Sequence, residues 1–73
     1  MAYDYSLLLK KIKEVYGSQA VFAIAMKLSE RTMSLKLNNK KDWKQGEIKK
    51  ACEILLINRE EIPEYFFIPK VQN

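Results

Sequence analysis

Apolar residues recur every three or four positions along most of the chain, the spacing that places them on one face of an α-helix. Residues that begin or end helices separate these runs. Asp4, Ser18 and Ser29 are suited to N-caps, and Gly17 to a left-handed stop. The pattern predicts an all-α chain, a single domain over residues 1–73. Its five helices are expected at about residues 5–16, 19–26, 30–37, 45–56 and 59–66.

The buried faces of these helices predict the core. Its members are Leu8, Ile12, Val15 and Tyr16 in the first helix, Phe22, Ala23 and Met26 in the second, Met33 and Leu37 in the third, and Ile48, Ala51, Cys52 and Leu55 in the fourth. Trp43 is expected to anchor the core by packing against the end of helix 30–37. Asn58 and Glu61 have the spacing of a capping box, and Pro63 interrupts the last helix unless it begins a turn of its own.

The C-terminal tail places three aromatic residues and an isoleucine in a row, at positions 65–68. One face of a short helix cannot bury all four. Part of the tail is therefore expected to close the core against the first and fourth helices. The remainder forms an exposed apolar patch, which often marks a protein interface.

Residues 18–39 carry the most specific pattern. Two eight-residue helices flank a three-residue break at positions 27–29, and Ala23 is small where the second helix must cross closely. The second helix buries Met33 and Leu37. Two short helices joined at a steep angle, the second with a polar outer face, form a helix-turn-helix, which puts its second helix into the DNA major groove. Its outward residues are Glu30, Arg31, Ser34 and Leu35.

Charge is concentrated around the same unit. Residues 27–50 hold eight basic and three acidic side chains, a net charge of +5, whereas residues 1–26 carry +1 and residues 51–73 carry −2. This distribution would draw a polyanion to one side of the molecule. A solvated lysine surface without a nucleic-acid partner is the alternative interpretation.

The amino-acid composition excludes several kinds of catalytic and metal-binding site. The chain has one cysteine and no histidine, which leaves no internal disulfide, no activated Cys52 nucleophile and no zinc-type ligand cluster. It also lacks a glycine-rich phosphate loop. We therefore expect no enzymatic activity, no cofactor and no metal. The longest apolar run is too short to span a bilayer, so a cytoplasmic protein without a membrane partner is expected.

Several segments together resemble the small Cro-like helix-turn-helix regulators of temperate phages of Gram-positive bacteria, over most of residues 5–67. The matching segments are Gln19, Phe22-Ala23, LSERT at 28–32, SLKLNNK at 34–40, DWKQ at 42–45 and IPEYFF at 62–67. The resemblance implies a compact five-helix bundle of the phage-repressor type. It also implies a transcriptional regulator of the lysis–lysogeny switch. Lys27 departs from the turn glycine of that family, and must adopt a positive φ at a cost of about 1 kcal/mol or reshape the turn.

The resemblance assigns DNA contacts to individual residues. Arg31 would bind guanine, Glu30 would accept from cytosine N4, Leu35 would cover a thymine methyl, and Ser34 would add a further contact. An ion pair between Arg31 and Glu30 is the alternative for that arginine. Phosphate contacts are assigned to Gln19, Asn38, Lys40, Lys41 and Lys44. In this interpretation the partners are a double-stranded operator and the cognate phage repressor. The resemblance also implies a homodimer and a place at the nucleoid of a bacterial host.

A second function fits the same surface. Glu30 and Leu35 stand where relatives usually carry polar base readers such as glutamine. An acid can pair with the basic residues of a repressor, and a leucine can anchor between them. The alternative is therefore an antirepressor that binds the cognate CI-type repressor and blocks or remodels its DNA binding. The protein-interface candidates are Glu30, Leu35, Phe67 and Ile68.

Overall fold

Five α-helices and one 3₁₀ helix form the fold in the computed structural model, which describes residues 2–71. Over these residues the predicted all-α, five-helix architecture is confirmed, and the only β pairing is an isolated antiparallel bridge between Tyr3 and Pro69. The elements are α1 (Ser6–Tyr16), α2 (Gln19–Met26), α3 (Glu30–Leu37), α4 (Gln45–Leu55), the 3₁₀ helix η1 (Arg59–Glu61) and α5 (Ile62–Phe66).

Local signals set most helix ends. Ser18 Oγ accepts from Val21 N at 3.2 Å and Ser29 Oγ accepts from Thr32 N at 3.0 Å, so both predicted N-caps are confirmed. Gly17 ends α1 at a φ of 83°, a conformation that glycine adopts without steric cost. Each of these ends needs only residues within one turn, which is why the sequence indicates them.

Three helix ends differ from the prediction. α1 begins at Ser6 rather than at residue 5, and its N-cap position is Tyr5 rather than the predicted Asp4. Asp4 Oδ1 still accepts from Ser6 N at 2.9 Å. Leu56 takes a left-handed φ of 58° and ends α4 one residue early. The last segment divides into η1 and α5, because a continuous helix would need an N–H group at Pro63.

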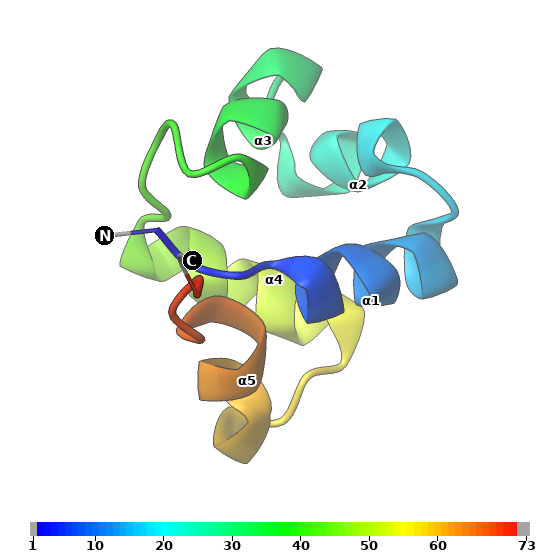
Figure 1. The fold of residues 1–73 in the computed structure, drawn as a ribbon. Helices are drawn as coiled ribbons and strands as arrows, with labels where there is room; N and C mark the ends of the chain where they lie inside the picture. The colour runs from blue at the N-terminus through cyan, green and yellow to red at the C-terminus, as the bar shows by residue number, and fades with distance from the viewer. Residues whose placement is uncertain (1, 72–73) are drawn as a thin grey trace.

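The helices pack in three tiers. Figure 1 shows α2 and α3 on one side, α1 and α4 across the middle, and α5 on the far side. α1 contacts α2, α4 and α5, while α2 also contacts α3 and α4. The largest fully buried apolar side chains at the centre are Leu8, Ile12, Phe22, Met33, Leu55 and Phe66.

One predicted core residue is wrong. Val15 is 43% exposed. Tyr16, which was also predicted for the core, makes the contact at the end of α1, where its ring packs on Phe22 with centroids 5.6 Å apart. The spacing of apolar residues allowed both side chains to face inward, and the position of α2 kept only Tyr16 against the core.

Lys27 forms the turn between α2 and α3 in a left-handed conformation, with φ 59° and ψ 37°. The helix end still satisfies its backbone, since Leu28 N donates to Ala23 O at 3.0 Å and Lys27 N donates to Ile24 O at 3.0 Å. A lysine in this region costs roughly 1–2 kcal/mol relative to glycine. The turn therefore keeps its geometry with a side chain that is poorly suited to it.

Residues 2–4 and 68–70 lie side by side, near the loop that follows α3. Asp4 N donates to Ile68 O at 2.7 Å, and Lys70 N donates to Ala2 O at 3.0 Å. The Asn39 side-chain amide pairs with the backbone of Tyr3, accepting from its N–H at 2.8 Å and donating to its carbonyl at 2.9 Å. These bonds hold the N-terminal segment against the end of α3.

A buried ion pair joins α3 to α4. Lys36 is only 1% exposed, and its Nζ lies 2.7 Å from Glu47 Oε1. The same ammonium donates to the backbone oxygen of Asp42 at 2.8 Å, while Glu47 also accepts from Lys44 N at 2.9 Å. The pair therefore ties together the last turn of α3, the following loop and the first turn of α4.

Glu47→Gln tests this pair. The amide can still cap α4, but it leaves the Lys36 ammonium buried without a counter-charge. The free energy of unfolding in urea should fall by about 3–5 kcal/mol. The double variant Lys36→Met, Glu47→Gln should recover part of this loss, because methionine carries no charge to desolvate. A loss below about 0.5 kcal/mol in Glu47→Gln, the usual range for surface substitutions, would contradict the role of the pair.

The pair also predicts a pH dependence. Burial alone would raise the pKa of Glu47, but the hydrogen bonds from Lys36 and Lys44 and the charges of both lysines lower it overall, below its ordinary value of 4.5. A carboxylate with a lowered pKa in the folded state stabilises the protein above its unfolded-state pKa. Its contribution is lost as the pH falls through the folded-state value. When the pH is lowered below 4.5, the free energy of unfolding should decrease. The decrease per pH unit should be smaller in Glu47→Gln, which lacks this carboxylate.

Candidate functional site

The outward face of α3 presents the residues that the sequence analysis assigned to base reading. Met33, Lys36 and Leu37 occupy the buried face of this helix. Consequently Glu30 and Arg31 are exposed in its first turn, whereas Ser34 and Leu35 are half-buried. All four residues lie on one short helix, but only the first two are fully available to a partner.

Some polar side chains of this face are hydrogen-bonded within the protein, and Arg31 is not ion-paired with any described residue. Asn38 Nδ2 donates to the Ser34 backbone oxygen at 2.8 Å and lies 3.3 Å from Ser34 Oγ. Ser34 and Asn38 thus satisfy each other at the end of the helix. Arg31 forms no ion pair with any residue in the 2–71 range, so the alternative pairing with Glu30 is not observed there.

The loop after α3 carries the basic residues assigned to phosphate contacts. Lys40, Lys41 and Lys44 are exposed. The loop is held in place because the backbone N–H groups of Lys40 and Lys41 donate to Leu35 O at 2.8 and 3.2 Å. Gln19, the remaining candidate, is half-buried at the first position of α2. In Figure 1 the start of α2 and this loop lie on opposite sides of the α2–α3 unit.

The electrostatics of this surface are mixed. Lys36, which the sequence counts within the basic block, is buried and neutralised by Glu47. The exposed charge of the α3 region therefore comes from the lysines of the loop and from Arg31, with the acid Glu30 at the start of the helix. Such a surface can attract an anionic partner at its rim and a cationic group at Glu30.

The tail candidates lie on a different surface. Tyr65 and Phe66 are buried, which leaves Phe67 and Ile68 exposed at 46% and 45%. The ring of Phe67 packs edge-on against Tyr3, with centroids 5.9 Å apart. Part of the tail therefore closes the core and part remains outside, as predicted. The structure places Phe67 and Ile68 after α5, beside the N-terminal segment, and not on α3 with the other interface candidates.

Sequence reasoning missed a pair of exposed apolar residues on α2. Val21 and Ile24 of α2 are 47% and 76% exposed. Their spacing of three residues, on the side of α2 opposite Phe22 and Met26, was a usable signal. Lys36 was missed in the same way, since it lies three residues after buried Met33 and therefore on the buried face of α3.

The structure of residues 2–71 gives no support for a metal site, a reactive cysteine or a membrane-spanning helix. Within residues 2–71 no group of three or more His, Cys, Asp or Glu side chains could hold a metal ion. Burial raises the pKa of the Cys52 thiol, which keeps it protonated and unreactive. No helix in that range is long and apolar enough to cross a membrane.

Comparisons with known proteins relate the chain to a phage regulator. It is similar to the solution structure of the modulator of repression of the temperate bacteriophage TP901-1 from Lactococcus lactis, with 60% sequence identity and a TM-score of 0.82. The match covers 99% of this chain and 97% of that one. No curated protein matches the chain. Residues 1–68 match the family described as "Protein of unknown function (DUF739)", and the chain therefore belongs to that family.

Proposed function

We propose that this chain regulates repression in a temperate phage by binding the phage repressor protein through the outward face of α3. The chain is 60% identical to a protein named as a modulator of repression of a temperate bacteriophage, which supports a role in the control of repression. The two proteins match over nearly their whole lengths. The proposed role is that of a regulator and not of an enzyme.

The chemistry of the outward face of α3 carries this proposal. Glu30 is an exposed acid at the start of the helix, and Leu35 is half-buried further along it. DNA phosphates repel an acid, whereas the DNA-reading surface of a repressor is basic and attracts it. Leu35 supplies apolar area, which is enriched in the buried core of protein interfaces. Binding there would cover the repressor's contacts with its operator.

The exposed face of α2 supports a protein partner as well. Val21 and Ile24 offer apolar area next to the turn that leads into α3. Apolar side chains gain nothing from phosphate oxygens but contribute to a protein interface when buried. The α2–α3 unit would then serve as a helix-turn-helix scaffold that presents a protein-binding surface.

Direct operator binding is the second candidate, favoured by one specific observation. Lys40, Lys41 and Lys44 are all exposed in the loop after α3, where they could contact phosphates on either side of a helix lying in the major groove. Arg31 would then be the base reader. The two candidates differ in what the chain binds when it is alone, which an assay can separate.

Substitution of Leu35 and Glu30 tests repressor binding. Leu35→Ala should weaken binding to the purified repressor of the same phage by about tenfold or more, through loss of the apolar anchor. Glu30→Lys should weaken it at least as much through charge reversal. Calorimetric titration of the repressor would measure both affinities.

Glu60→Lys is the matched control for the charge reversal. Glu60 is an exposed acid on η1, and η1 adjoins α5 on the side of the molecule away from α3 (Figure 1). Binding by this variant should equal that of the unaltered chain. If Leu35→Ala and Glu30→Lys remain folded by circular dichroism and also bind normally, α3 is not the repressor interface.

Operator binding predicts a different result. The chain alone should shift operator DNA, and Lys40→Ala should weaken binding to every sequence alike while lowering the salt slope by about one unit. Arg31→Ala should instead cost about 1–3 kcal/mol and relax specificity at one base pair. A gel-shift titration over several salt concentrations measures both effects. Absence of any shift by the chain alone would reject this candidate.

A further inference from the structure

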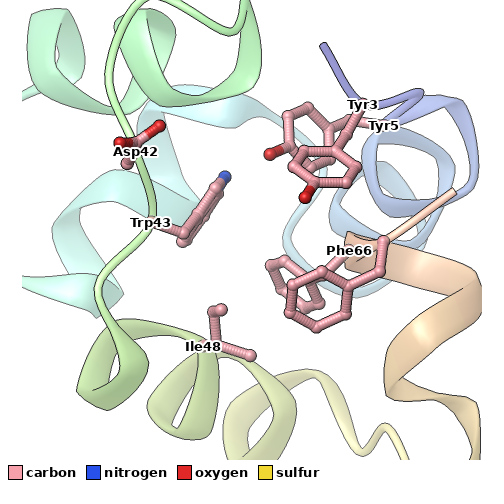
Figure 2. A pocket seen from close by; sticks show the side chains of 7 residues that line it. Tyr3, Tyr5, Asp42, Trp43, Ile48 and Phe66 are labelled. Atoms are coloured by element: carbon pink, nitrogen blue, oxygen red, sulfur yellow. The ribbon is translucent and has the colours of Figure 1, made fainter. Parts of the chain in front are cut away.

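A cavity lies beside the loop before α4, at a place that the proposed surface of α3 does not use. Its volume is about 370 Å³, and five aromatic side chains line it together with Ile48 and Asp42. Figure 2 shows Asp42, Trp43 and Ile48 on one side of the hollow, and Tyr3, Tyr5 and Phe66 on the other. The lining therefore comes from parts of the chain that are far apart in sequence.

The aromatic rings form a continuous wall. Trp43 packs edge-on against Phe66 with centroids 5.2 Å apart, and against Tyr5 at 6.4 Å. Tyr3 follows at 6.3 Å from Tyr5 and is itself in contact with Phe67. Aromatic rings carry negative potential on their faces, so several rings around one space attract a cation. Trp43 thus packs against the core as predicted, and its aromatic neighbours come from the N-terminal segment and α5.

Asp42 adds a full negative charge at the rim of the cavity. The ammonium of Lys36 donates a hydrogen bond to the backbone oxygen of Asp42, but its ion pair is with the carboxylate of Glu47. Within residues 2–71 no ion pair involves the carboxylate of Asp42. The pKa of Tyr5 is raised chiefly by burial, with smaller contributions from Tyr3 and from the charge of Asp42. The carboxylate of Asp42 therefore gives this rim of the cavity a negative charge.

Trp43 supplies a hydrogen-bond donor that no described residue uses. Its Nε1 is buried without an acceptor, and in Figure 2 this nitrogen points toward the side of the hollow formed by Tyr3 and Tyr5. Buried donors in proteins are nearly always paired. A ligand with an acceptor close to a positive group would satisfy both features of the cavity.

We propose that the cavity binds an alkylammonium group, held by the aromatic wall and by Asp42, with a neighbouring carbonyl of the ligand accepting from Trp43 Nε1. The group can come from a lysine side chain of a protein partner or from a free small amine. The proposal does not depend on the function assigned to α3, because the two surfaces share none of the residues that carry either argument.

Fluorescence provides a direct test, because Trp43 is the only tryptophan of the chain. The whole protein is titrated with n-butylammonium, with a Gly-Lys-Gly tripeptide blocked at both ends, and with uncharged n-butanol. Both cations should change the emission saturably, and n-butanol should not. Tighter binding of the tripeptide would identify a protein side chain as the source, whereas equal affinities would identify a free amine.

Asp42→Asn is the decisive variant. It removes the charge but keeps the backbone oxygen that Lys36 binds, so the fold should persist. Affinity for both cations should fall about tenfold, while Glu60→Gln, which removes an exposed acid on η1, should bind normally. Trp43→Phe, followed by amide shifts in NMR spectra, should weaken the tripeptide more than n-butylammonium.

Three results would overturn the proposal. They are the absence of a saturable change with either cation, an equal response to n-butanol, and unchanged affinity in Asp42→Asn. Unchanged tripeptide affinity in Trp43→Phe would remove the assigned role of Nε1.

Discussion

The buried pair between Lys36 and Glu47 is the constraint on which the arrangement of α3 depends. Lys36 lies within the apolar stripe of its helix, where a charge is tolerated only with a close counter-charge and further hydrogen bonds. Glu47 supplies the charge, and it can do so only if α4 begins close to the end of α3. Because Lys36 points inward, the rotation of α3 about its axis is fixed, and Arg31 and Leu35 are directed away from the core.

The same pair organises the loop between the two helices. Lys36 holds this loop through the backbone oxygen of Asp42, while Asn39 pairs with the backbone of Tyr3. The loop is thus bonded at one point to the core and at another to the N-terminal segment. Its exposed lysines and the aromatic cavity around Trp43 lie on the same short stretch of chain. A substitution in the ion pair would therefore alter the positions of both the exposed lysines and the aromatic cavity.

The α2–α3 surface combines features suited to two kinds of partner. Its loop is basic, as in proteins that bind phosphates, while Glu30, Val21 and Ile24 suit a protein. Similarity to a modulator of repression relates the chain to phage regulation. The α2–α3 unit thus presents both chemistries on adjacent helices.

The sequence by itself determined the features that depend on neighbouring residues. The caps at Ser18 and Ser29, the stop at Gly17 and the inward face of α2 all follow from side chains within one or two turns. The outward direction of Glu30 and Arg31 could be predicted for the same reason. Only the tertiary structure decided that Lys36 is buried while Val15 is exposed, because burial depends on which element packs against each face, and local spacing does not contain that information.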